Sequence, residues 1–266
     1  MSLVSKVGWF MRYMMFFSGI DDVRAFSTLR KNQVAPAAKG GPQEVALNLR
    51  RKPGATLFCR PGTSDAEVLW DVFWGKYHLP ADPLAEKPVI FDLGANVGFS
   101  CFDFGTLYPH ARVFGVELDQ DNVAMARRNT AALGARCEIV HAAIWSENGE
   151  VTYSKSDEEW GYHISGDQDA SSASQVTVRA ISIDTLMQEV GVDWIDFMKM
   201  DIEGAEHAVL DPQAGWLQRT GALNLEVHAP ATIENCTEIL SQAGFTCQRS
   251  PRHKSAILAK RPPAAR

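Results

Sequence analysis

The sequence lacks features that define several whole classes of protein. Its 266 residues contain five cysteines, an odd number, widely spaced and without a C-x-x-C pair, which excludes both a disulfide framework and a zinc knuckle. Basic residues are in deficit, with 26 Lys and Arg against 32 Asp and Glu and a formal charge of −6. No general affinity for nucleic acid or anionic lipid is therefore expected, because phosphate binding needs clustered Lys and Arg.

Long hydrophobic runs are also missing. The longest candidate, residues 7–20, is short and contains Arg12, whereas a membrane span needs about 20 apolar residues. The segment lacks the small-residue cleavage site of a signal peptide, so a cytoplasmic enzyme is the default expectation. We expect its aromatic side chains to dock onto the domain; the alternative is an interfacial helix or one that pairs two copies in a homo-oligomer. These aromatic residues are Trp9, Phe10, Tyr13, Phe16 and Phe17.

What remains is the composition of a globular protein, 45% hydrophobic and 22% charged, which is able to bury a full core. Residues 1–55 predict a helical extension followed, over 31–55, by a linker rich in Pro and Gly. Residues 56–262 predict a single α/β domain, which opens with a helix over 66–77. A lid-like insertion rich in Gly and Ser is expected over about 145–175.

The order of apolar runs predicts a mostly parallel sheet. Buried strands are expected at 89–93, 113–118 and 138–144, separated by a glycine turn and by a helix that begins after Asp119. Further strands are expected at 176–181, 194–200 and 223–227, and Thr232 is expected to cap a helix. An antiparallel hairpin, formed by 245–248 and 256–259, closes the edge of the sheet.

The first strand ends in D-L-G-A-N-V-G at residues 92–98, which only partly matches a dinucleotide fingerprint. An acidic residue beside the turn would repel a pyrophosphate, whereas S-adenosylmethionine has no phosphate and carries two cationic groups. Glycines would let the backbone approach such a ligand. Glu117 ends the next strand, where its carboxylate can accept both ribose hydroxyls. The predicted donor contacts are Asp92, Gly94, Asn96, Gly98, Glu117 and Ala143, the last through its backbone near the adenine.

Together with V-I-F-D-L-G-A-N-V-G at 89–98, the segments V-E at 116–117, I-S-I-D-T-L at 181–186 and D-F-M-K-M-D-I-E-G-A-E at 196–206 resemble the FkbM-type methyltransferases. The resemblance covers about residues 57–260. It implies a class I methyltransferase fold, a Rossmann-like seven-stranded sheet with helices on both faces, and S-adenosylmethionine as methyl donor. It further implies an acceptor oxygen on a sugar, glycoside, polyketide or other secondary metabolite. N- or C-methylation is less favoured because no N-P-P-Y-type motif occurs.

Polar residues after the later strands point toward the same crevice. Asp201 follows one strand, and Glu226 and His228 follow the next, where ligands of open α/β sheets bind. Transfer of a methyl group to a hydroxyl needs help in removing the proton. Two schemes are open: His228 as general base, or Asp201, Glu226 and His228 holding Mg²⁺ or a similar cation.

Structural interpretations compete with these assignments. Asp201 could cap the following helix, and Glu203 and Glu206 could favour its positive N-terminus. His228 could be a buried polar group that only supports its neighbours, and Lys199 is expected to be structural. In the lid-like insertion, Trp160, Tyr162 and His163 could stack on a sugar or lie in an ordinary surface loop. The alternative to an enzyme is a nucleotide-binding scaffold without catalysis.

Overall fold

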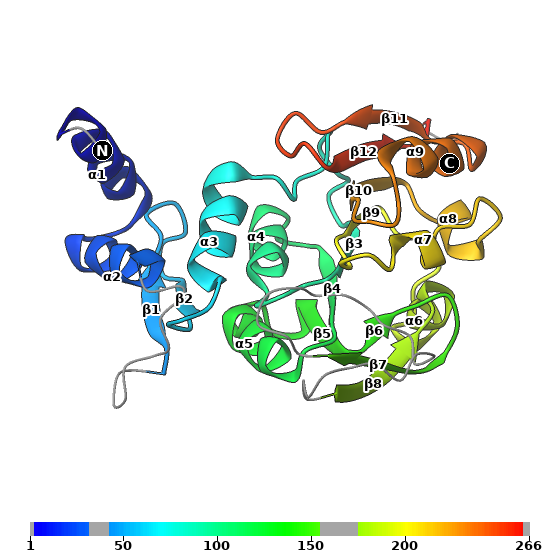
Figure 1. The fold of residues 1–266 in the computed structure, drawn as a ribbon, viewed down its shortest axis with the longest axis horizontal. Helices are drawn as coiled ribbons and strands as arrows, with labels where there is room; N and C mark the ends of the chain where they lie inside the picture. Colours follow the sequence, from blue (N-terminus) through cyan, green and yellow to red (C-terminus); the bar gives the residue numbers. More distant parts are fainter. Residues whose placement is uncertain (1–2, 32–42, 155–174, 263–266) are drawn as a thin grey trace.

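The computed structural model describes residues 3–31, 43–154 and 175–262. Its centre is a seven-stranded sheet of order β11-β12-β10-β9-β3-β4-β5 (Figure 1). The strands are β3 (Val89–Leu93), β4 (Arg112–Glu117), β5 (Cys137–His141), β9 (Phe197–Met200), β10 (Ala222–Glu226), β11 (Thr246–Arg249) and β12 (Ala256–Lys260). Neighbours from β10 to β5 pair in parallel, whereas β12 pairs antiparallel with both β10 and β11. The predicted parallel sheet with an antiparallel hairpin is confirmed.

Helices cover both faces of this sheet, as predicted. The side chain of Ile90 packs with residues of α4 and α5, while the next residue, Phe91, packs on the opposite face with α6, α8 and α9. This alternation is the two-residue period of a strand. The helices are α4 (Phe99–Leu107), α5 (Gln120–Thr130), α6 (Ile183–Glu189), α7 (Glu206–Val209), α8 (Gly215–Gln218) and α9 (Ile233–Gln242), and a 3₁₀ turn, η2 (Ala131–Arg136), follows α5.

Two helix starts follow from local sequence. The Asp119 carboxylate accepts hydrogen bonds from the backbone N–H groups of Asp121 and Asn122 at the start of α5. The Thr232 hydroxyl accepts one from the N–H of Asn235 at the start of α9. Both satisfy donors that a helix terminus leaves without partners, which is why short-range chemistry alone placed these two boundaries.

The N-terminal region adds a second layer of packing beside α4. Phe16, the last residue of α1, packs against Trp70, and the next residue, Phe17, packs against Phe16. This cluster extends to Phe99 and Phe102 of α4. The aromatic segment thus docks onto the domain. Trp9 keeps about a third of its surface exposed, at 37%. The elements are α1 (Leu3–Phe16), α2 (Ile20–Lys31), β1 (Val45–Asn48), β2 (Thr56–Cys59) and α3 (Asp65–Trp70), which continues as a π-helix, η1 (Asp71–Gly75).

Two segments differ from expectation. Strand β1 lies within the predicted linker. These residues form a strand because they pair antiparallel with β2 and bury Leu47 completely. The strand expected over 138–144 divides after β5, and β6 (Ala143–Ile144) instead joins a three-stranded sheet, β6-β8-β7, with β7 (Gly149–Ser154) and β8 (Gln175–Ile181). Trp160, Tyr162 and His163 lie outside the described residues. Among those described, no helix has the length and hydrophobicity to cross a membrane.

Candidate active site

A cavity of about 250 Å³ opens at the carboxyl ends of β3, β4 and β9. This is the position where open α/β sheets bind their ligands. Four of the predicted donor contacts line it, namely Gly94, Asn96, Glu117 and Ala143. Apolar side chains, including Val116, Leu118 and Ile144, form the wall beside Ala143.

The turn between β3 and α4 owes its shape to backbone conformations that most residues avoid. Gly94 and Gly98 have φ angles of 81° and 80°, and Asn96 has a φ of 48°. A Cβ atom on Gly94 would lie 1.7 Å from the carbonyl oxygen of Asp201, and one on Gly98 would lie 2.8 Å from the Cα of Ala126. These glycines therefore let the turn pack against β9 and α5, whereas the sequence argument had given them the role of admitting a ligand.

Glu117 anchors the turn while facing the cavity. Its Oε2 accepts a hydrogen bond from the backbone N–H of Asn96 and its Oε1 accepts one from that of Asp119, both at 2.8 Å. Burial raises the pKa of this carboxyl group, and the two backbone donors oppose the rise. Each carboxylate oxygen has lone pairs for a further hydrogen bond, so two donated hydroxyl groups can still be accepted.

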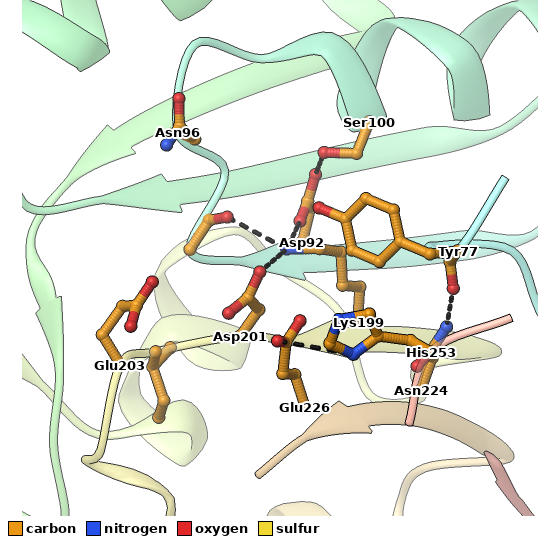
Figure 2. A network of polar contacts seen from close by, with 12 residues as sticks. Tyr77, Asp92, Asn96, Ser100, Lys199, Asp201, Glu203, Asn224, Glu226 and His253 are labelled. Carbon is orange, nitrogen blue, oxygen red and sulfur yellow. Dashed lines mark hydrogen bonds and ion pairs between the residues drawn. The ribbon is translucent and has the colours of Figure 1, made fainter. Parts of the chain in front are cut away.

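Asp92 lies behind the cavity wall, in contrast to the predicted direct contact with the donor. It is fully buried, and its charge is already met by Lys199, whose Nζ lies 3.3 Å from Asp92 Oδ1 (Figure 2). It also accepts a hydrogen bond from the hydroxyl of Ser100. A residue placed in this way supports the turn from behind.

Lys199 bridges the turn and the acidic residues after β9. Its Nζ donates to the carbonyl oxygen of Gly94 at 3.1 Å and lies 3.2 Å from Asp201 Oδ2. Burial acts to lower the pKa of the ammonium group, but Asp201 and Asp92 outweigh it, so the pKa is raised and the group stays charged. Among the described residues that line the cavity, Lys199 is the one basic side chain beside Glu117, Asp201 and Glu203. The lining is thus acidic, which disfavours phosphate and favours a cationic ligand.

Four polar side chains converge at the end of this cavity that Asp201 and Glu203 line. Nε2 of His228 lies 3.5 Å from Glu203 Oε2, 3.6 Å from Glu226 Oε1 and 3.9 Å from Asp201 Oδ1. The structure therefore brings together the three predicted residues and adds Glu203. One potential ligand atom from each of Asp201, Glu203 and His228 lies within 4.8 Å of the others. Glu203 has a positive φ of 51°, a strained conformation that is common at functional sites.

Glu206 orients the imidazole ring of His228. Its fully buried carboxylate contacts His228 Nδ1 at 3.0 Å and accepts hydrogen bonds from the backbone N–H groups of Ile202 and Gly204. It is thus Glu206, rather than Asp201, that receives N–H groups ahead of α7. The hydrogen bond that His228 donates to the Glu206 carboxylate raises the pKa of His228 to about 9, against the effect of burial and with help from the charge of Glu203. The free protein therefore carries a protonated imidazole near neutral pH.

Two residues of this region belong to no sequence motif that would have predicted a role for them. Tyr77 lines the cavity from the loop after η1. His253 comes from the turn between β11 and β12 and contacts Glu226, with Nδ1 3.5 Å from Glu226 Oε1. Neither lies near the glycine turn or the D-I-E-G-A-E segment in sequence. Only the fold brings them to the site.

The strand order, the bent glycine turn and the acidic cavity together define a class I methyltransferase fold. Residues 92–247, more than half of the chain, match the family described as the methyltransferase FkbM domain. The chain belongs to this family, which confirms the resemblance drawn from the motifs.

Two curated relatives are similar over part of their length. A 2-O-methyltransferase, NoeI, of Sinorhizobium fredii is 30% identical over 151 residues, which cover 51% of this chain and 62% of the relative. A hexuronic acid methyltransferase, AglP, of Haloferax volcanii is 25% identical over 163 residues, covering 61% and 65%. The chain thus spans less than two thirds of either relative. A solved precorrin-6y C5,15-methyltransferase from Geobacter metallireducens aligns with this chain at 15% identity and a TM-score of 0.42. The alignment covers 74% of this chain and 87% of the other, and the fold assignment does not depend on it.

Proposed function

We propose that this protein transfers a methyl group from S-adenosylmethionine to a hydroxyl group of a sugar or glycoside. The observation that carries the proposal is an acidic cavity lined by Glu117 at one end and by Asp201 and Glu203 at the other. His228 lies beside Asp201 and Glu203, and Glu226 lies beside His228. The two curated relatives, whose names specify 2-O-methylation and a hexuronic acid, support an acceptor of this class.

The donor fits the residues at the Glu117 end. The free lone pairs of Glu117 suit the two ribose hydroxyls, and the apolar wall beside Ala143 suits the adenine. Asp201 and Glu203 continue the acidic lining toward the part of the ligand that carries the sulfonium and ammonium charges. When bound, the donor supplies an electrophilic methyl group; the chain supplies its orientation.

At the acceptor end, the hydroxyl must lose its proton as its oxygen bonds to the methyl carbon and the carbon–sulfur bond breaks. We assign Asp201, Glu203 and His228, with Glu226 beside them, as the residues that would hold a divalent cation such as Mg²⁺. Carboxylate oxygens are the ligands this ion prefers, and a bound cation lowers the pKa of a coordinated hydroxyl. The cluster itself supports the choice, because three carboxylates surround one imidazole and attract positive charge. A bound cation would take the place of the proton that His228 holds in the free protein.

Removal of divalent cations tests this assignment. Dialysis against EDTA is expected to lower methyl transfer from labelled donor at least tenfold, and added Mg²⁺ or Mn²⁺ is expected to restore it. Binding of S-adenosylhomocysteine, measured by calorimetry, should change less than twofold in the same samples. An enzyme that remains fully active after EDTA treatment would remove the cation from the proposal and leave proton removal to the side chains of the cluster themselves.

The donor half is tested by Glu117→Gln, which keeps the shape of the side chain, removes its charge and leaves one of its two oxygens to accept a hydrogen bond. We expect about a tenfold weaker Kd for S-adenosylhomocysteine, since a hydrogen bond to a charged group contributes about 1.5–3 kcal/mol and about 1.4 kcal/mol is a factor of ten. Glu150→Gln, at an exposed position on β7, is the matched control. Unchanged affinity in the Glu117 variant, or tight binding of NAD by the wild-type protein, would contradict the assignment. Donor binding without methylation of any acceptor would instead indicate a scaffold.

A further inference from the structure

Tyr77 enters the cavity from a segment outside the family match, which begins at residue 92. The preceding turn is a π-helix, η1, a form that often marks functional positions. Lys76, which follows it, has a left-handed backbone with a φ of 57°. Such a conformation is unfavourable for lysine and persists only where surrounding contacts enforce it.

Contacts on both sides fix the backbone at Tyr77. The side chains of Lys76 and His78 both reach one buried carboxylate oxygen, Asp103 Oδ2, at 3.4 Å and 3.1 Å. The carbonyl oxygen of Tyr77 accepts a hydrogen bond of 2.7 Å from Asn224 Nδ2, which comes from β10 (Figure 2). The chain thus uses three side chains to hold one tyrosine at a set position.

The side chain of Tyr77 is held in place without a polar partner of its own. Within the described parts of the chain its hydroxyl group makes no hydrogen bond, although the residue is only partly exposed. Figure 2 shows the ring beside Lys199 and the hydroxyl directed toward Asp92 and Ser100, that is, toward the glycine turn. Burial raises the pKa of this phenol, so the hydroxyl remains a hydrogen-bond donor.

His253 packs beside the ring of Tyr77. The two ring centroids are 6.0 Å apart, and His253 Nδ1 is buried and lacks a hydrogen bond among the described residues, while lying 3.5 Å from Glu226 Oε1. His253 also lies beyond the family match, which ends at residue 247. Two segments flanking the matched region therefore meet at the acceptor end.

We propose that Tyr77 forms the acceptor-recognition wall of the site, by contacting a pyranose ring with the part of its ring that lines the cavity and by donating its hydroxyl to an acceptor oxygen. His253 is a positioning residue that supports Tyr77 and Glu226 from outside the cavity lining. An aromatic ring with a polar tip suits a sugar, which has an apolar C–H face and polar edges. The inference rests on the proposed function, which it extends by assigning acceptor selection to residues outside the matched region.

The test uses the full chain with S-adenosylhomocysteine bound and measures binding of methyl β-D-glucopyranoside and methyl β-D-glucuronide by calorimetry. Methyl transfer from labelled donor to the same probes gives kcat and KM.

Tyr77→Ala is expected to weaken probe binding and raise KM at least tenfold. Tyr77→Phe should keep KM within threefold and lower kcat/KM about fivefold. His253→Ala should raise KM about threefold, and His253→Gln should recover most of that loss. Donor affinity should stay within twofold in every variant.

Tyr108→Phe removes a hydroxyl elsewhere and is the matched control; it should behave as wild type. Wild-type probe binding in Tyr77→Ala overturns this inference alone, as does a loss of donor affinity equal to the loss of probe affinity, because Tyr77 would then belong to the donor site. Uptake of donor but of neither probe by the wild-type protein overturns the inference together with the sugar acceptor. Failure to take up the donor overturns the proposed function, and the inference falls with it.

Discussion

Replacement of Asp201 by Asn is expected to lower kcat at least 100-fold. Asp201 lies 3.9 Å from His228 Nε2, lines the cavity and faces Lys199 at 3.2 Å. Losing its charge weakens both the proposed cation site and the polarisation of the acceptor hydroxyl, and groups that act on the reacting proton typically contribute about 10² to 10⁴ in rate. The fold should survive, because Lys199 keeps its ion pair with Asp92.

The measurement is single-turnover transfer of a labelled methyl group with saturating donor, alongside the Kd for S-adenosylhomocysteine. The donor Kd is expected to change far less than kcat. Asp211→Asn alters an exposed carboxylate, which accepts a local N–H from Gln213, and should leave both quantities unchanged. If Asp201→Asn kept kcat within threefold of wild type, Asp201 would be a structural partner of Lys199 and no more.

Asp103→Asn is expected to lower the free energy of unfolding by about 3–5 kcal/mol, the usual cost of breaking a buried ion pair from one side. Asp103 is fully buried, with Oδ1 2.8 Å from Lys52 Nζ and Oδ2 close to Lys76 and His78. Its removal leaves the partly buried Lys52 without a counter-charge and frees the loop that carries Tyr77. Urea unfolding followed by circular dichroism measures the effect.

The control is Asp82→Asn, which removes an ion pair of 2.7 Å with Lys260 in which both side chains are more than half exposed. Exposed pairs contribute at most about 1 kcal/mol. A similar loss in both variants would contradict a special role for the buried carboxylate.

The same carboxylate predicts a response to acid. Burial alone would raise the pKa of Asp103, but the hydrogen bond with His78 and the charge of Lys52 lower it from 3.8 to about 2. A carboxyl whose pKa is lower in the folded state binds its proton more readily when unfolded, so its contribution is complete above pH 4 and is lost as pH falls toward 2. We expect about 1 kcal/mol of this loss between pH 5 and pH 3, absent from Asp103→Asn.

Much of the fold follows from local sequence. The bounds of β3 match the apolar run at 89–93, and the helix starts at Asp119 and Thr232 were set by side chains that bond to backbone groups two or three residues away. The strands that the sequence did not predict correctly depend on pairing with another strand. Strand β1 is explained by its pairing with β2, and β6 by its pairing with β8.

The residues of the site divide in the same way, into those that local sequence predicts and those that only the fold brings into place. Gly94, Asn96 and Glu117 could be found because the turn and the end of the next strand impose residue types at fixed spacing. Asp92 was assigned to the ligand because its charge was visible in sequence, whereas its neutralising partner, Lys199, is 107 residues away along the chain and pairs with it only through the register of β3 with β9.

The sequence by itself determined the alternation of strands and helices, the bent turn and the set of carboxylates at the strand ends, since these depend on contacts within a few residues. The tertiary structure alone decided which of those carboxylates face the cavity, that Glu206 holds His228, and that Tyr77 and His253 contact each other. Charge, burial and hydrogen bonding depend on distances in space, and for residues far apart in the chain those distances are fixed only when the sheet has formed.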